Sequence, residues 1–382
     1  MRSVHVINGL GPGGAEQSLA EIVRNLPDYG VRPTVACFQH QAEGVEQLLV
    51  RAGVDVRFLE DPRPAGRVRE LRRLIGSVGA DVVHTTIFEA DVLGRLAAWR
   101  VAPVLTSIVN PSYAKERLAA DPNLRRHRLR GAQVIDAVTA RLMTARFHAI
   151  TEAVKVAAIH DLHLNPADIA VVPRGRDVQR LGDASPQRRA VVRESLGVAA
   201  TTPVMLNTGR REYQKGQTHL LAAAAFVRRA RPDVRWFIAG REGNASESLR
   251  ERHRQLELDA SVLFLGYRDD VPDLIAAADV FIFPSLFEGL GGAVIEAMAL
   301  GLPVIASDIP AVREVLDGGR CGVLVPPGEP RPLANAVLAL LDDEPRRTQL
   351  ATAASERFHQ RYTLEQMVSG MAALLKETAA LA

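Results

Sequence analysis

The chain has 382 residues, of which 47% are hydrophobic and 24% are charged. This composition excludes a disordered or low-complexity chain, and the length fits two domains of ordinary size. The formal net charge of +3 is small, and by itself it does not indicate nucleic-acid binding. We therefore expect a two-domain globular protein with no nucleic-acid partner.

The cysteines and the apolar runs bear on the compartment. Cys37 and Cys321 lie in apolar runs, far apart in the sequence and without metal-ligand spacing. We expect buried thiols and no disulfide between them. No signal segment precedes the first predicted strand, and no apolar stretch reaches the ~18 residues that span a bilayer. These features predict a soluble, cytoplasmic protein, with peripheral association at the inner face of the membrane left open.

Short β-rich runs alternate with helical patterns along the whole chain. The predicted strands are residues 4–7, 34–38, 54–58, 81–84, 103–107 and 170–173, then 203–209, 234–240, 261–266, 279–285 and 302–307. This rhythm is typical of the α/β class, with one doubly wound parallel sheet in each half. The polar, arginine-rich stretch 173–189 reads as a linker. It divides the chain into domains 1–178 and 179–362, and residues 363–382 form a terminal helix that we expect to pack back on the first domain.

A glycine-rich loop follows the first predicted strand. Gly9, Gly11 and Gly14 match the pattern G-x-G-x-x-G. A dinucleotide site would also need an acidic residue near the end of the second strand, but Gln39 and His40 stand there. We expect instead that the loop faces a cleft between the domains. The helix that begins at Gly14 would offer its N–H groups to a phosphate group in this cleft.

Most of the candidate site residues of the second half lie in one stretch, "FEGLGGAVIEAMALGLPVIAS", residues 287–307. Glu288 is predicted in a turn after a strand, Gly291 and Gly292 loosen the backbone, and Glu296 lies about one turn inside the next helix. Ligands of open parallel sheets bind beyond the carboxyl ends of the strands. Two carboxylates there suit neutral hydroxyl groups, such as those of a sugar and a ribose. The structural alternative is that each glutamate only stabilises a helix start.

Upstream, "GRREYQKG" follows the first strand of the second half. Arg210 and Lys215 bracket this turn, where two cations can neutralise a diphosphate leaving group. Their neighbour Arg211 is expected to be solvated. The structural alternative is that both cations are simply exposed loop residues.

Together these motifs resemble the retaining nucleotide-sugar glycosyltransferases of family 4, which have the GT-B fold. The resemblance rests on "GRREYQKG", on E-x7-E from Glu288 to Glu296, on "GGAE" from Gly13 to Glu16 and on "DVVH" ending at His84. It implies two Rossmann-like domains that face a central cleft. It also implies metal-independent transfer with retention, without a cofactor.

The resemblance assigns roles to these residues. Arg210, Lys215 and Glu288 would be catalytic: the two cations would bind the donor diphosphate, and Glu288 would contact donor-sugar hydroxyls. Glu296 would hold the ribose. Backbone amides at three glycines complete the expected donor site: Gly14, Gly291 and Gly292. The acceptor-side candidates are Gly13, His84 and Thr86.

The chain departs from the family pattern in several places. Many members have H-x-H where this chain has His84 and Thr86, so the sugar contact of the second histidine is in question. His84 has the alternative of an ordinary strand-end histidine. Arg174 and Arg176 replace residues that are often Asn and aliphatic, and they would touch an anionic acceptor or be solvated.

The strongest cationic run of the first half extends from Lys115 to Arg130. Its default interpretation is a solvated helix face, and the alternative is a contact with anionic lipid. The predicted function is transfer of a sugar from a nucleotide diphosphate sugar to the hydroxyl of a glycan or lipid-linked acceptor, in cell-surface glycan or glycolipid synthesis. The competing hypotheses are a sugar-nucleotide epimerase of the same fold and a non-catalytic carbohydrate-binding relative.

Overall fold

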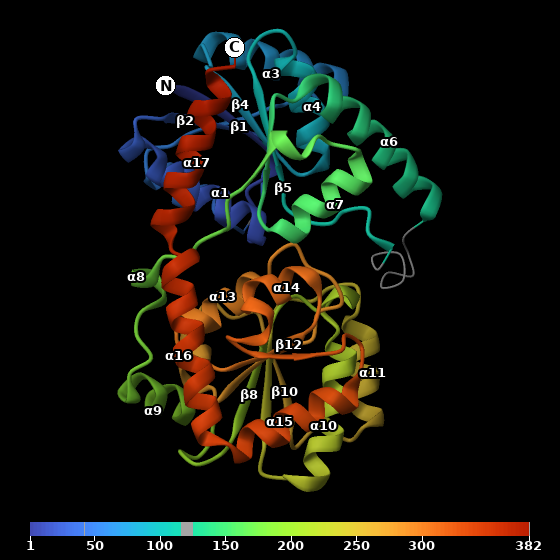
Figure 1. Cartoon of the computed structure of the whole chain (residues 1–382), viewed down its shortest axis with the longest axis vertical. Coiled ribbons are helices and arrows are strands. Elements are labelled where there is room, and N and C mark those ends of the chain that lie inside the picture. The colour runs from blue at the N-terminus through green and yellow to red at the C-terminus, as the bar shows by residue number, and fades with distance from the viewer. Residues whose placement is uncertain (42, 116–124, 382) are drawn as a thin grey trace. The chain divides into compact units, whose positions relative to one another are not determined.

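The computed structural model describes residues 1–41, 43–115 and 125–381 (Figure 1). The described chain divides into two compact units. The first contains the residues up to 114, residues 125–175 and the residues from 364 onward, and the second contains residue 115 and residues 176–363. Each unit is built around its own parallel sheet.

The first unit has a seven-stranded sheet in the order β3-β2-β1-β4-β5-β6-β7. All neighbouring strands are parallel. Its strands are β1 (Arg2–Gly9), β2 (Arg32–Gln39), β3 (Asp55–Phe58), β4 (Val82–Thr86), β5 (Val104–Ile108), β6 (Arg146–Ala149) and β7 (Ile169–Val171).

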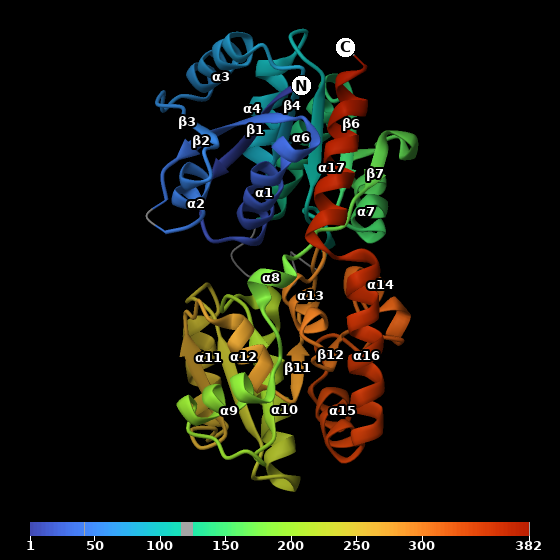
Figure 2. The same ribbon diagram turned by 90° about the vertical axis from the view of Figure 1, so that its left-hand side faces the viewer.

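Helices cover both faces of this sheet. They are α1 (Gly14–Asn25), α2 (Glu46–Arg51), α3 (Pro64–Val78), α4 (Phe88–Ala98), α6 (Arg126–Met143), α7 (Glu152–Leu162) and α17 (Leu364–Ala379). One apolar core joins α1 and α17 to the sheet, and a second lies under α3 and α4. Figure 2 shows α17 lying along this sheet, although it comes from the far end of the chain.

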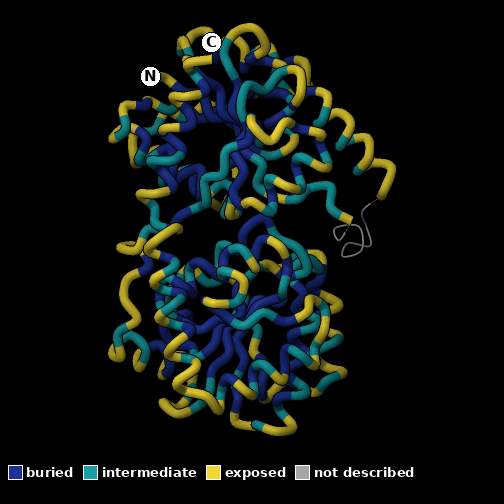
Figure 3. Tube along the Cα trace, viewed as in Figure 1, coloured by how far each residue is buried: buried dark blue, intermediate teal, exposed yellow. Residues whose placement is uncertain are grey.

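The second unit has a six-stranded parallel sheet in the order β10-β9-β8-β11-β12-β13. Its strands are β8 (Val204–Thr208), β9 (Arg235–Ala239), β10 (Val262–Gly266), β11 (Val280–Phe283), β12 (Val304–Ser307) and β13 (Val323–Val325). Most strand residues are buried (Figure 3). Because both faces of the sheet are covered, the strand sequences are mostly apolar.

The helices of the second unit mostly alternate with its strands, with two of them before β8 and two after β13. They are α8 (Val178–Leu181), α9 (Pro186–Ser195), α10 (Gln217–Ala230), α11 (Ser246–Gln255), α12 (Val271–Ala277), α13 (Gly292–Ala299), α14 (Pro310–Val315), α15 (Pro330–Asp342) and α16 (Glu344–Arg361). Trp236 and Leu221 lie in the large apolar core of this unit, which packs α10 and α15 against the sheet.

The predicted α/β class and the doubly wound parallel sheets are confirmed. Two strands, β6 and β13, were not predicted. Cys37 and Cys321 are buried, unpaired thiols, and burial raises the pKa of Cys37 to about 12. Among the described helices, none is long and apolar enough to cross a membrane.

Candidate functional site

The strand order of the second unit marks where a ligand would bind. Strand β8 comes first in the sequence of this sheet, and its neighbours are β9 on one side and β11 on the other. The chain therefore reverses its winding direction between β8 and β11, which is the topological switch point of a doubly wound sheet. Lys215 follows β8 and Glu288 follows β11, so both lie at the carboxyl ends of the two strands that flank this point.

A glycine builds the turn after β8. Gly216 has φ +61°, and a Cβ there would lie 2.1 Å from the carbonyl oxygen of Pro284. The turn therefore needs a residue without a side chain, for backbone conformation and for close approach. It is tied to the turn after β11 by two hydrogen bonds: Leu286 N–H donates to Gln214 O at 2.8 Å, and the Gln214 side-chain amide donates to Phe287 O at 2.9 Å.

These contacts bring Lys215 and Glu288 together. Lys215 Nζ donates to Glu288 Oε1 at 2.6 Å, with 21% of the lysine side chain and 9% of the glutamate side chain exposed. The ammonium also lies 5.8 Å from the centre of the Phe283 ring. A charge-assisted pair in a half-buried setting is well ordered. It presents both a cation and a carboxylate at the switch point.

The two neighbouring arginines differ sharply. Arg210 is 62% exposed on its side chain and pairs with Glu212 at 2.8 Å. The expectation that Arg211 is solvated is wrong. Arg211 is buried with 6% exposure, pairs with Glu242 and lies over the Phe264 ring at 4.5 Å. The stacked guanidinium helps to pack the start of the turn, and Arg210 is left at the surface.

The second glutamate lies one turn inside α13. Gly291 precedes this helix with φ +93°, so the chain enters α13 through a left-handed residue that favours glycine. Glu296 Oε1 accepts a hydrogen bond from Arg176 Nε at 2.7 Å. From the sequence we expected Arg176 either to contact an anionic acceptor or to be solvated. Neither expectation includes a pair with Glu296. Sequence separation hides it, because 120 positions lie between the two residues.

The first unit has a switch point of its own, between β1 and β4. Helix α1 begins at Gly14, and a Cβ on Gly13 would lie 2.3 Å from Glu16 Oε2. The Glu16 carboxylate is therefore folded over the start of α1, where an acidic side chain in the first turn interacts favourably with the helix dipole. Arg174 Nη1 donates to Gly14 O at 2.9 Å. Gly13 and Gly14 remain predicted contacts of the substrates.

His84 belongs to a buried chain of hydrogen bonds across the first sheet. The chain joins Ser3 Oγ to His5 Nε2 (2.9 Å), His5 Nδ1 to His84 Nδ1 (2.9 Å), His84 Nε2 to Ser107 Oγ (2.6 Å), Ser107 Oγ to His148 Nδ1 (2.7 Å) and His148 Nε2 to Val172 O (2.8 Å). A carbonyl only accepts, which assigns the proton of His148 to Nε2. Burial lowers the pKa values of all three rings, so each is neutral. With neutral rings, the same logic makes Ser107 donate to His148 Nδ1 and makes His84 donate to Ser107 through Nε2.

The contacts of His84 therefore favour the interpretation that it is an ordinary strand-end histidine and not an acceptor contact. Its ring is 2% exposed, and both ring nitrogens are used within the chain. Burial holds the pKa of His84 well below its usual value, and the rings of His5 and His148 lower it further. No ring nitrogen is left for an acceptor molecule, so this residue is better explained as part of the sheet.

Polar groups gather where β4 ends. Thr86 is 3% exposed, and its hydroxyl has no hydrogen-bond partner among the described residues. The next residue, Ile87, has φ +79°, which is strained for a β-branched side chain. A cavity of about 50 Å³ opens beside it and is lined by Asp91 and Tyr113. Burial raises the pKa of Asp91 to about 6. Thr86 stays a predicted acceptor contact.

Two family models match this chain. Residues 12–180 match the model described as Glycosyltransferase Family 4, and residues 189–357 match the one described as Glycosyl transferases group 1. The chain belongs to glycosyltransferase family 4. Within the part of this glycosyltransferase that the structure describes, no three His, Cys, Asp or Glu side chains form a group that could hold a metal ion.

Curated relatives of this glycosyltransferase act on several substrates. It is 27% identical over 277 residues to an Escherichia coli UDP-Gal:alpha-D-GlcNAc-diphosphoundecaprenol alpha-1,3-galactosyltransferase, covering 72% of this chain and 70% of that one. It is 28% identical to the D-inositol 3-phosphate glycosyltransferase of Pseudarthrobacter chlorophenolicus, covering 90% and 86%. With the Rhizobium meliloti lipopolysaccharide core biosynthesis mannosyltransferase LpsB it shares 30% identity over 53% of this chain and 59% of that one.

Solved structures establish the GT-B fold of this glycosyltransferase. HepE of Anabaena, solved in complex with UDP and glucose, matches with a TM-score of 0.85 and 23% identity over 99% of this chain and 100% of that one. Sucrose-phosphate synthase from Thermosynechococcus elongatus matches with a TM-score of 0.81 and 19% identity, covering 100% of both chains.

Proposed function

We propose that this glycosyltransferase moves a hexose from a nucleotide diphosphate sugar to an acceptor hydroxyl, with retention of the anomeric configuration and without a metal ion. The observation that carries the proposal is the Lys215–Glu288 pair at the switch point of the second sheet. The cation and the nearby start of α13 suit a diphosphate, and the carboxylate suits sugar hydroxyls. Charge stabilisation of the departing diphosphate is then the main catalytic effect.

A donor screen tests this proposal. Thermal shift with UDP-, GDP- and ADP-sugars should identify one nucleotide that stabilises the full chain, because a ligand that binds only the folded state raises its stability. Proton NMR of the product formed from that donor should show the anomeric configuration of the donor. An inverted product, or no stabilisation by any of the nucleotides, would refute the corresponding part of the proposal.

Metal independence has a separate test. Turnover with the identified donor should survive exhaustive EDTA treatment, because in this proposal Arg210, Lys215 and helix N–H groups stabilise the diphosphate. Loss of turnover on chelation, with recovery on addition of Mg²⁺ or Mn²⁺, would show that a metal ion is required.

The competing functions make different predictions. An epimerase would exchange the sugar C2 hydrogen with deuterium from solvent, and a binding protein would neither transfer the sugar nor hydrolyse the donor. The acceptor we propose is a glycan or a lipid-linked sugar, in cell-surface glycan or glycolipid synthesis. Two relatives support this class: the named acceptor of the Escherichia coli enzyme is a lipid-linked sugar, and the Rhizobium enzyme is named for lipopolysaccharide core biosynthesis.

We further propose that α6 of the first unit contacts an anionic membrane. The predicted run from Lys115 to Arg130 lies partly outside the described residues, but its end forms the start of α6. This helix carries an outward apolar stripe: Val134, Ile135, Val138 and Leu142, which are 62%, 50%, 51% and 70% exposed. Three of them recur at intervals of four residues and so share one face.

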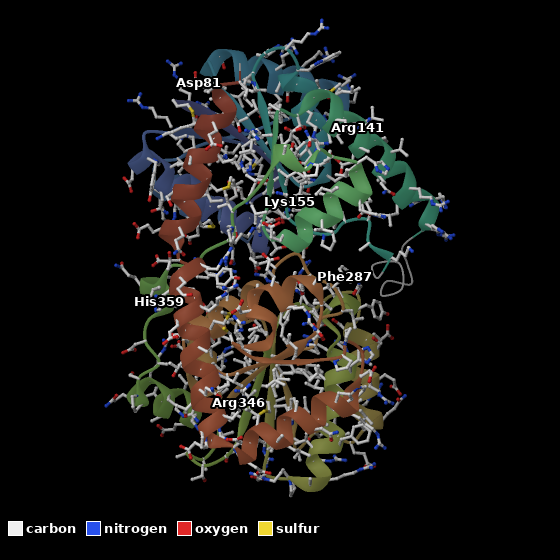
Figure 4. All side chains as sticks on the ribbon, in the orientation of Figure 1. Asp81, Arg141, Lys155, Phe287, Arg346 and His359 are labelled. Carbon is white, nitrogen blue, oxygen red and sulfur yellow. The ribbon has the colours of Figure 1, made fainter. Side chains whose placement is uncertain are left out.

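Exposed arginines accompany the stripe, at Arg128, Arg130 and Arg141 (Figure 4 labels the last). An apolar face flanked by cations is typical of helices that lie in a membrane interface. The opposite face is anchored to the unit: Asp136 pairs with the buried Arg95 at 2.6 Å. The helix is therefore held with its stripe outward, and most of its residues are coloured exposed or intermediate in Figure 3.

Flotation with phosphatidylglycerol vesicles tests this contact. Binding should weaken with salt, because each basic residue near the surface contributes about 1 kcal/mol. Replacing the four apolar residues with serine should also reduce the binding that remains at high salt. The matched control is Val191→Ser on α9, which removes an equally exposed valine. Equal flotation of the stripe variant and the control would refute the contact.

A further inference from the structure

Arg176 is held where the donor would bind. Its backbone N–H donates to Tyr362 O at 2.9 Å, and it forms a parallel bridge with Thr363. The base of the side chain is therefore fixed to the last residues of the second unit. From there the side chain extends to Glu296, and only 19% of it is exposed. A long side chain with this anchoring loses little further entropy when it contacts a ligand.

The guanidinium lies over the first residue of α13. A Cβ on Gly292 would lie 2.3 Å from Arg176 Nη2, so glycine leaves the space that the Nη2 group occupies. The first turn of a helix has N–H groups without intrahelical acceptors, and together with the helix dipole they favour an anion. Here an arginine adds a full positive charge at the same place.

The pair with Glu296 has a second consequence. Arg176 Nε is bonded to one carboxylate oxygen, Oε1, and this bond fixes the orientation of the carboxylate. A hydrogen bond from arginine through one oxygen leaves the second oxygen with its full capacity to accept from hydroxyl groups. The arginine thereby orders the group that we expect to bind the ribose.

We propose that Arg176 is a specificity and positioning residue of the donor site. It orients Glu296 for the ribose, and its guanidinium joins the start of α13 in binding a phosphate of the nucleoside diphosphate. This inference rests on the proposed function and adds a third cation to Arg210 and Lys215. Arg176, which the sequence places in the linker, is thereby assigned to the donor site.

Calorimetry with the full chain tests the assignment. UDP, GDP and ADP are titrated first, and the nucleotide that binds the unchanged protein is then used as the probe, alongside its nucleoside. Arg176→Met should weaken the diphosphate at least 10-fold and the nucleoside less, because the methionine removes the charge at the phosphate. Arg176→Lys should recover only part of the loss, because an ammonium lacks the planar fork of donors.

Arg231→Met is the matched control. Arg231 is also partly exposed and paired with carboxylates, those of Asp233 and Asp342, but it precedes β9 and so lies at the amino ends of the strands. It should bind the probe as the unchanged protein does. The double variant Arg176→Met, Glu296→Gln should lose less than the product of the two single losses, because the residues act as a pair.

Each other outcome counts against the proposal. If Arg176→Met binds the diphosphate as well as the control does, Arg176 is only a structural partner of Glu296. Tighter binding would mean that the arginine blocks the site. Equal losses of affinity for the diphosphate and for the nucleoside would show that Arg176 does not contact a phosphate. Failure of the unchanged protein to bind any of the three nucleotides would instead refute the proposed function on which the inference rests.

Discussion

At the scale of single residues, Lys215 and Glu288 are the pair on which turnover should depend most. Lys215→Ala should lower kcat roughly 10²-fold or more, the usual cost of losing one charge-stabilising group. It also leaves a carboxylate that is 9% exposed without its partner, so the unfolding free energy should fall by about 1 to 3 kcal/mol. Steady-state kinetics and urea unfolding measure the two effects.

The double variant Lys215→Met, Glu288→Gln separates catalysis from stability. It removes both charges, so no unpaired ion remains and much of the stability should return. Its kcat should stay low, because the cation at the diphosphate is still missing. Recovery of kcat together with stability would show that the pair is structural.

Arg210 should behave differently from Lys215. Its side chain is 62% exposed, and its partner Glu212 lies two residues away. Exposed pairs contribute little to stability, so Arg210→Ala should change the unfolding free energy by less than about 0.5 kcal/mol. Its kcat should nevertheless fall roughly 10²-fold, by the same loss of charge at the diphosphate. Near-normal turnover would remove Arg210 from the donor site.

At the scale of elements, the turn between β8 and α10 should depend on Gly216. Gly216→Ala meets both a positive φ and the carbonyl of Pro284, so it should cost on the order of 1 to 3 kcal/mol and displace Lys215. The control is Gly76→Ala near the end of α3, where a Cβ meets nothing within 4 Å. That change should stabilise by up to about 1 kcal/mol. Equal unfolding free energies for the two variants would contradict the role of the turn.

The elements also show what the sequence could and could not predict. Apolar strands such as β2 and β11 are recognisable because both sheet faces bury them. Strand β6, "RFHA", was not predicted, because His148 interrupts its apolar pattern. The hydrogen bond that accommodates this histidine is seen only in the folded sheet. Strand β13 has three residues next to glycine and proline, and such short runs carry little periodicity.

At the scale of the whole molecule, the buried histidine chain should set the response to acid. Burial lowers the pKa of His5 to about 3 and of His148 to about 4, and it also lowers that of His84. Because these folded-state pKa values lie below the usual 6.5, the unfolded chain binds more protons below pH 6.5. Stability should be full above pH 6.5 and fall below it, by up to about 1.4 kcal/mol per histidine for each pH unit.

Urea unfolding between pH 7 and pH 5 checks this prediction. His148→Gln removes one of the three rings, so the fall in stability with acid should become shallower, whatever its cost at pH 7. His160→Gln, which replaces an exposed ring, should leave the slope unchanged. The histidine chain would be ruled out as the cause if the unchanged protein and His148→Gln showed the same slope.

The candidate site was predictable to the extent that it is local in sequence. The glycines and glutamates after β11 can be recognised in the sequence because the strand end, the turn and the helix start lie within a few residues of one another. Contacts between distant segments could not be derived in this way. Arg176 with Glu296, Arg211 over Phe264 and the partners of His84 all depend on how segments far apart in the sequence pack together.

In the proposed function, Glu288 and Glu296 bind different ends of one donor in the second unit. The most direct measurement is calorimetry of the free nucleoside diphosphate with the unchanged protein, Glu288→Gln and Glu296→Gln. This ligand has a ribose but no transferred sugar. We expect that Glu296→Gln weakens binding of the diphosphate and raises the donor KM, whereas Glu288→Gln binds the diphosphate almost normally and loses kcat. Equal weakening by both variants would contradict it.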